Sequence, residues 1–185
     1  MTGAGRLAGS LVVDQRETLR VLLGDDGYGR VLDAVPREAR EEYEQALGVS
    51  WVPTEVVDEV VRTAARYVGR PLLEFHSDLT RRNLERTLRG IWRVLLRFTS
   101  DQALIQRTPV FYRKSYDTGA LEGSIPEPGH AVSTLRGYPG ISDVQLTGLR
   151  VGIETVLSMA GRLDVRGRHR RTADGAVIDC FWAER

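Results

Sequence analysis

The sequence predicts an α+β fold in which N-terminal helices pack with a small antiparallel sheet of two hairpins flanking a helix. Three observations support this prediction. Apolar residues recur at three- and four-residue steps through the first half of the chain, which is typical of helices. From Ala120 onward the pattern changes to that of strands joined by tight turns. A helical pattern between Ser142 and Gly161 then separates the two strand pairs.

Composition bounds the kind of protein. A length of 185 residues suits a single domain, residues 1–185, and 42% hydrophobic with 28% charged residues is ordinary for a globular chain. The formal net charge of +1 gives no overall field that would attract nucleic acid or an anionic membrane. A single cysteine excludes an intramolecular disulfide, and no apolar run approaches the roughly 18 residues of a membrane span. We therefore expect a cytoplasmic protein without a secretion signal.

The first helices are predicted from their end signals. Residues 9–13 are interpreted as a short extended lead-in, and Asp14 as the N-cap of a helix over residues 15–23 that ends near Gly24. A short helix is expected over residues 28–34. Pro36 suits the first turn of another helix that continues to about Leu47.

Two stronger helical patterns follow. Valines and alanines recur on one face between Pro53 and Val68, and Gly69 can end that helix. A second pattern between Leu84 and Phe98, widened by Trp92, predicts the central helix of the core. Its outer arginines are expected to be solvated. They are Arg82, Arg86, Arg89, Arg93 and Arg97.

The second half of the chain predicts the sheet. The helical pattern is interrupted at Thr108–Pro109, because the residue before a proline disfavours the α region. Strands are expected over 120–125 and 130–137, joined by a Pro- and Gly-containing turn, and over 163–170 and 176–182. Between these hairpins, Ser142 or Asp143 caps a helix that ends at Gly161. Gly148 and Gly152 leave bare backbone on that helix, for close packing or for a ligand.

No catalytic constellation is found in the sequence. There is no Walker loop, nucleophile elbow or His-Glu-x-x-His pair, and the three histidines, His76, His130 and His169, are far apart. Glu74 and Asp78 flank His76, but they would serve a metal only if another element supplied further ligands. Cys180 would share a strand face with Ile178 and Trp182, so we interpret it as a core filler. The sequence predicts no catalytic residues and no metal site.

A basic run near the C-terminus leaves two interpretations open. It consists of Arg166, Arg168, His169, Arg170 and Arg171. These side chains could bind phosphate or an acidic partner protein, or they could be the solvated surface of a hairpin.

Several short motifs, taken in order, carry a resemblance that covers most of the chain. They are Ser50-Trp51-Val52-Pro53, Gly69, Arg107-Thr108-Pro109 with Tyr112 and Tyr116, Thr147-Gly148, and Cys180-Phe181-Trp182. Together they resemble a myxobacterial paralogue family, which is distantly similar to four-vinyl reductase, haem-NO-binding and TRAPP-type domains. This resemblance implies helices packed on a small antiparallel sheet, in several cases around an apolar ligand cavity.

The sequence also departs from these relatives. Haem-NO-binding domains use a helical histidine ligand and a Tyr-x-Ser-x-Arg motif, but this chain lacks the motif and has no histidine between Leu84 and Phe98. Sensory four-vinyl reductase domains hold zinc through several cysteines, which Cys180 alone cannot do. We therefore expect no haem, no zinc and no other cofactor.

The resemblance implies a non-enzymatic small-ligand-binding or signalling module with an apolar pocket. The alternative is a protein-interaction scaffold or adaptor acting as a homodimer, as TRAPP subunits imply. The pocket is expected between the helix of residues 84–98, the helix of residues 146–160 and the sheet. Its expected lining residues are Trp92, Phe98, Tyr112, Tyr116, Leu149 and Ile153.

Overall fold

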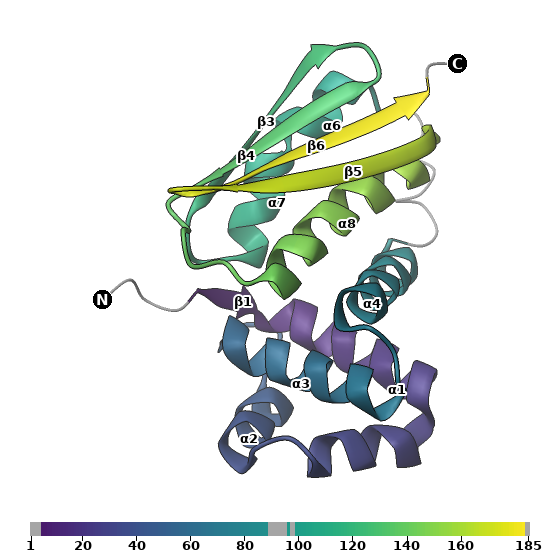
Figure 1. Cartoon of the computed structure of the whole chain (residues 1–185), viewed down its shortest axis with the longest axis vertical. Coiled ribbons are helices and arrows are strands. Elements are labelled where there is room, and N and C mark those ends of the chain that lie inside the picture. Colours follow the sequence, from purple (N-terminus) through teal and green to yellow (C-terminus); the bar gives the residue numbers. More distant parts are fainter. Residues whose placement is uncertain (1–4, 89–95, 97–98, 184–185) are drawn as a thin grey trace.

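The structure is a computed structural model that describes residues 5–88, 96 and 99–183. It places a group of helices beneath a twisted four-stranded sheet (Figure 1). The helices are α1 Gly9–Asp33, α2 Arg37–Gln45, α3 Thr54–Tyr67, α4 Leu72–Thr87, α6 Asp101–Gln106, α7 Thr108–Ser115 and α8 Asp143–Met159. The strands are β1 Arg6–Ala8, β2 Trp51–Pro53, β3 Ala120–Glu127, β4 His130–Arg136, β5 Leu163–Thr172 and β6 Gly175–Ala183. The predicted α+β class is confirmed.

The main sheet consists of the two predicted hairpins. Its strand order is β3-β4-β6-β5, and every neighbouring pair is antiparallel. The helix α8, between the hairpins in sequence, packs beneath β5 and β6, while α6 and α7 pack beneath β3 (Figure 1). One face of the sheet is therefore covered by helices, and the opposite face forms the outer surface of the molecule.

The pleat of β6 separates its side chains as the sequence predicts. Ile178, Cys180 and Trp182 are buried on the helix-covered face, whereas Asp179 and Phe181 are only half-buried on the outer face. Burial raises the pKa of the Cys180 thiol to about 12. The interpretation of Cys180 as a core filler is confirmed.

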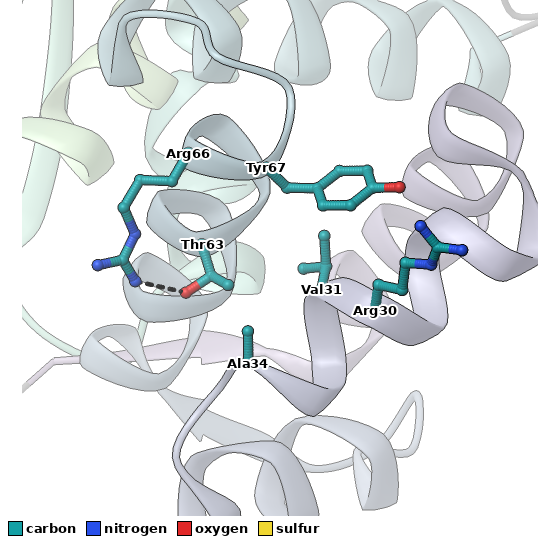
Figure 2. A pocket seen from close by; sticks show the side chains of 6 residues that line it. All are labelled: Arg30, Val31, Ala34, Thr63, Arg66 and Tyr67. Carbon is teal, nitrogen blue, oxygen red and sulfur yellow. Dashed lines mark hydrogen bonds between the residues drawn. The ribbon is translucent and has the colours of Figure 1, made fainter.

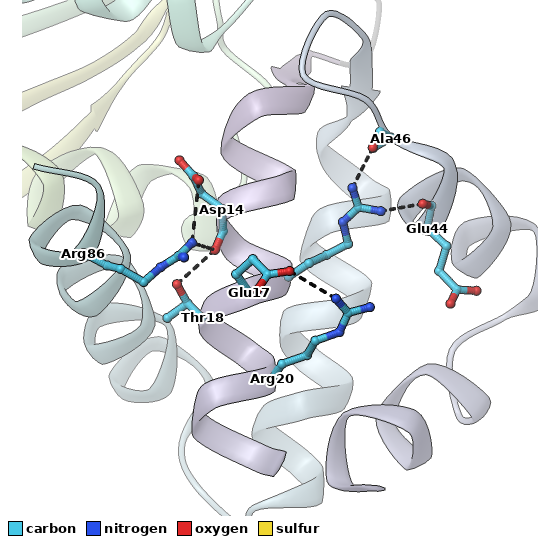
Figure 3. A network of polar contacts seen from close by, with 8 residues as sticks. Asp14, Glu17, Thr18, Arg20, Glu44, Ala46 and Arg86 are labelled. Atoms are coloured by element: carbon cyan, nitrogen blue, oxygen red, sulfur yellow. Dashed lines mark hydrogen bonds and ion pairs between the residues drawn. The ribbon is translucent and has the colours of Figure 1, made fainter. Parts of the chain in front are cut away.

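The beginning of α1 differs from the prediction. The extended segment is β1, and α1 already begins at Gly9, so the expected lead-in over residues 9–13 is wrong. Asp14 lies within the helix and is not its N-cap. The Arg86 guanidinium on α4 donates to the Asp14 carbonyl at 2.8 Å, and it lies 3.6 Å from the carboxylate (Figure 3). The acidic residue that looked like a cap instead joins two helices.

A two-stranded sheet was not expected. Strands β1 and β2 pair antiparallel, with Leu7 opposite Val52 and Ala8 opposite Trp51. Leu7 also forms an isolated bridge with Tyr116. These contacts tie the start of the chain to the segment before α3 and to the end of α7.

The middle helices match the prediction in part. Helices α2 and α3 occupy the expected positions, and Gly69 ends the α3 region with a φ of 66°. Leu84 belongs to α4, which begins after Pro71, where the helical pattern of the sequence resumes, and which ends at Thr87 instead of continuing unbroken to Phe98. The rest of that predicted helix, including Trp92 and Phe98, lies outside the described residues except for position 96.

Helices α6 and α7 are separated at Arg107, next to the interruption that the sequence predicts at Thr108–Pro109. Thr108 and Pro109 begin α7, because a proline is tolerated in the first turn, where its missing N–H leaves no bond unmade.

Among the described residues, no helix combines the length and the apolar character that crossing a bilayer requires.

Candidate functional site

The candidate site is centred on an apolar stripe along α8. Leu149, Ile153 and Val156 follow one another at steps of four and three residues, which places them on one side of the helix. All three are only half-buried, whereas Leu146 and Leu157 of the same helix are fully buried. Water therefore reaches part of an aliphatic surface in a helix that otherwise packs into the core.

The neighbouring side of α8 lies directly against α4. A Cβ added to Gly148 would lie 2.8 Å from Nε2 of His76, closer than real side chains pack. A Cβ added to Gly152, one turn later, would lie 3.8 Å from Cδ1 of Leu84, which is ordinary van der Waals contact. The two glycines that the sequence left open to packing or to a ligand therefore face another helix.

His76 is a neutral, buried imidazole in this contact. Burial lowers its pKa from 6.5 to about 4, although a hydrogen bond to the Val144 backbone acts in the opposite direction. Nδ1 has no partner among the described residues, so the bond to the Val144 carbonyl comes from Nε2. The ring is thus held against the first turns of α8.

The structure does not bring together the side chains around His76 that were considered as metal ligands. Residues two apart on a helix point in different directions, and Glu74 is exposed while Asp78 pairs with Arg70 and Arg81. No group of three or more His, Cys, Asp or Glu side chains is placed to hold a metal ion within the part of the chain that is described.

Two of the predicted aromatic residues form a buried pair. The rings of Tyr112 and Tyr116 stack with centroids 5.0 Å apart and an interplanar angle of 15°. The Tyr112 hydroxyl donates to the Thr118 carbonyl at 2.6 Å, and the Tyr116 hydroxyl donates to Oε1 of Gln145 at 2.9 Å. Burial raises the pKa of both phenols, so both hydroxyls are protonated donors at neutral pH.

Gln145 continues this chain of hydrogen bonds to the helical layer. Its Nε2 donates to Oδ1 of Asp58 on α3 at 2.5 Å. Burial raises the pKa of the Asp58 carboxyl, while hydrogen bonds from Ser142 and Gln145 act in the opposite direction. Neither Asp58 nor Gln145 was expected from the sequence. The available signal was a polar residue between Val144 and Leu146, at a position that a packed helix usually fills with an apolar side chain.

The six predicted lining residues are thus distributed over several places. Tyr116 contacts the first turn of α8 through Gln145, and Tyr112 stacks on Tyr116. Leu149 and Ile153 lie one and two turns further along that helix. Trp92 and Phe98 lie outside the described residues. Whether the six together line one pocket stays a prediction.

A separate hollow of about 300 Å³ lies between α1 and α3. Figure 2 shows Tyr67 facing Val31 across it, with Arg30 at one end and Arg66 at the other. The Arg66 guanidinium donates to the Thr63 hydroxyl at 3.0 Å. None of the predicted lining residues borders this hollow.

Comparison with known proteins shows the fold. No protein-family profile and no curated protein matches the sequence. Among solved structures, the chain is similar to a Cs H-NOX mutant, with a TM-score of 0.70 and 10% identity over 96% of this chain and 97% of that one. The Fe(II) unliganded H-NOX protein from K. algicida gives a TM-score of 0.70 and 6% identity over the same shares. An oxygen-binding H-NOX domain related to soluble guanylate cyclases gives 0.67 and 11% over 95% of each chain.

Proposed function

We propose that this protein is a non-enzymatic small-ligand-binding or signalling module that binds an apolar molecule along the Leu149–Ile153–Val156 stripe of α8. The observation that carries the proposal is the partly exposed aliphatic stripe of α8, whose side chains pack against the core but remain within reach of solvent. Apolar surface of this kind gains free energy when a ligand removes it from water. The end-to-end likeness to H-NOX domains supports the proposal, because one of these neighbours is an oxygen-binding H-NOX domain.

The side chains of this protein do not fit the haem for which two related H-NOX structures were studied. All three histidines are described, and His76 and His130 are already engaged. Nε2 of His76 is held against the α8 backbone, where even one added carbon at Gly148 would clash. His130 stacks on Phe181 on the outer face of the sheet, with Nε2 3.0 Å from Asp179.

His169 lies among charged side chains and not in an apolar pocket that would suit a porphyrin. It is half-buried on β5, where Arg150, Asp143, Arg171 and Glu154 act electrostatically on its imidazole. The Tyr-x-Ser-x-Arg motif expected for the propionates is also missing from the sequence. We therefore propose an organic apolar ligand in place of haem, and no step of the proposed function depends on a porphyrin.

A thermal-shift experiment tests this function. The protein would be titrated with saturated fatty acids, isoprenoid alcohols and small aromatic compounds, and separately with haemin. We expect at least one apolar compound to raise the unfolding midpoint in proportion to its concentration, because a ligand that binds only the native state stabilises it. Haemin is expected to give no Soret band of a ligated haem.

A pair of variants locates the site. Ile153→Gln places an amide in the stripe and is expected to abolish the shift. Val21→Gln is the control, because Val21 is a 78% exposed aliphatic residue on α1, away from the stripe. A shift that survives in Ile153→Gln would place the ligand elsewhere, and no shift with any apolar compound would contradict the proposed function.

A homodimeric scaffold is a second candidate, supported by a different surface. Leu47, Val49 and Trp51 follow one another between α2 and β2 and are 66%, 91% and 40% exposed. Exposed apolar side chains gathered in one short segment are typical of protein interfaces. Light scattering of the wild type and of Val49→Ser/Trp51→Ser tests this candidate. A dimer that dissociates in the double variant supports it, and a monomeric wild type contradicts it.

A further inference from the structure

The arginines of β5 form a regular row on the outer face of the sheet. Arg166, Arg168 and Arg170 alternate along the strand and are exposed, while the residues between them are half-buried. The row lies at the edge of the sheet, because β5 pairs with β6 on one side and is the last strand in the order β3-β4-β6-β5. One long side of a ten-residue strand thus has no partner strand among the described residues.

The charges of this row are poorly neutralised. Arg168 lies 3.9 Å from Asp179, but that carboxylate also contacts His130 at 3.0 Å. Arg166 and Arg170 have no acidic partner within 4 Å in the described part of the chain. Arg171, which points to the opposite face, pairs with Asp143 of α8 at 2.6 Å. Arg171 on the helix-covered face is therefore paired, whereas the arginine row on the outer face remains available to bind a partner.

The acidic residues of β3, Glu122 and Glu127, are too distant to compensate. Both lie at the opposite edge of the sheet from β5. Three strand spacings of about 4.8 Å place them roughly 14 Å from β5. This exceeds the Debye length of about 8 Å at physiological ionic strength, so the row keeps its positive potential.

We propose that β5 binds an extended acidic segment of a partner protein, which adds to the sheet as a fifth strand. Main-chain hydrogen bonds to the free side of β5 would hold the segment, as in other cases of strand addition to a sheet edge. Every second side chain of the segment would lie on the outer face, opposite Arg166, Arg168 or Arg170. The preferred segment therefore carries Asp or Glu at alternate positions. This inference does not depend on the proposed small-molecule ligand.

A single-stranded nucleic acid is the competing occupant, and two observations disfavour it. Such binders use exposed aromatic rings as stacking platforms for bases. The aromatic ring beside the row, Phe181, is half-buried, with His130 stacked on it at 4.3 Å and the Arg168 guanidinium 5.1 Å from its centroid. A nucleic acid also makes no use of the unpaired edge of the strand, whereas a peptide does.

Fluorescence polarisation with defined peptides tests the proposal. The first probe is a labelled peptide that alternates glutamate and threonine over the length of β5. The second has the same composition, with all glutamates in one block, and the third carries N-methyl groups on the alternating peptide. We expect the alternating peptide to bind most tightly and N-methylation to abolish binding, since it removes the donors that would pair with the strand edge.

Matched variants on one strand separate the two faces. Arg166→Gln and Arg170→Gln are each expected to weaken binding of the alternating peptide about two- to fivefold, in line with cross-strand ion pairs. Arg171→Gln, on the opposite face, is expected to leave the affinity unchanged. Equal binding of all three peptides, no detectable binding, or tighter binding of a single-stranded oligonucleotide would overturn the proposal.

Discussion

Nε2 of His76 on α4 lies 2.8 Å from the position that the Cβ of any side chain at Gly148 on α8 would occupy. This contact sets the separation of the two helices at the candidate site. Hydrogen bonding of the imidazole to the Val144 carbonyl fixes the ring in this position. Because this contact is so close, alanine substitutions at Gly148 and at Gly152 are expected to change the free energy of unfolding in opposite directions.

Gly148→Ala is expected to destabilise the protein by about 1–3 kcal/mol, because overpacking at His76 outweighs the gain of about 1 kcal/mol that alanine brings to a helix interior. Gly152→Ala is the control. Its added methyl group would meet only Leu84 at 3.8 Å, so we expect it to raise the free energy of unfolding. Urea denaturation measures both. Equal effects of the two substitutions would contradict the close contact at His76.

The same imidazole gives a pH dependence. Because the pKa of His76 is about 4 in the folded protein and ordinarily 6.5, the unfolded chain takes up the proton first as pH falls. The contribution of His76 to stability is complete above pH 6.5 and is lost as the pH falls toward 4. Its size is about 3 kcal/mol, at roughly 1.4 kcal/mol for each pKa unit.

His76→Gln provides the comparison for this pH dependence. A glutamine can keep the donor to Val144 and does not titrate, so it removes the proton uptake and leaves other groups unchanged. We expect the stability difference between wild type and variant to shift in favour of the variant between pH 7 and pH 4. Parallel pH profiles of the two proteins would contradict a buried neutral His76.

Gln145→Leu is expected to cost about 2–5 kcal/mol. The substitution leaves the buried Tyr116 hydroxyl unpaired, which costs about 1–3 kcal/mol, and removes from the Asp58 carboxyl one hydrogen bond while the bond from Ser142 remains. Thr155→Val is a matched control on the same helix, because the buried Thr155 hydroxyl donates only to the Val151 carbonyl within α8. Thermal unfolding that ranks the two variants equally would show that the network does not stabilise the fold.

Cys180 is expected to react slowly with thiol reagents. Burial raises its pKa to about 12, so the thiolate is scarce at pH 8, and the side chain is 1% exposed. Since this is the sole cysteine of the chain, the colour released from a disulfide reagent reports on it alone. We expect full reaction in denaturant and almost none in the native state. Rapid native labelling would mean that the β6 region opens readily.

The sequence reveals most of the fold because most of it is encoded locally. The valine stripe of α3, the cap at Ser142 and the alternation in β6 each depend on neighbouring residues. The β1–β2 pair could not be predicted, since two three-residue segments more than forty positions apart carry no local pattern. Asp14 was misinterpreted as a cap for a similar reason, because its partner Arg86 is 72 residues away.

The site is harder to predict than the fold. Leu149 and Ile153 are visible from helical spacing, but their half-exposure depends on how α4 packs beside α8. The Asp58–Gln145 contact joins residues 87 positions apart, and although a polar residue between Val144 and Leu146 is unusual, nothing in the local sequence indicates its partner. Long-range polar contacts of this kind require the three-dimensional arrangement of the helices.

Binding of an apolar ligand at the α8 stripe is tested most directly by the unfolding midpoint of the wild type and Ile153→Gln with apolar compounds and with haemin. We expect an apolar compound to raise the midpoint of the wild type but not of the variant, and haemin to form no ligated complex with either. A histidine-ligated haem spectrum, or an identical response of both proteins to every compound, would contradict this expectation.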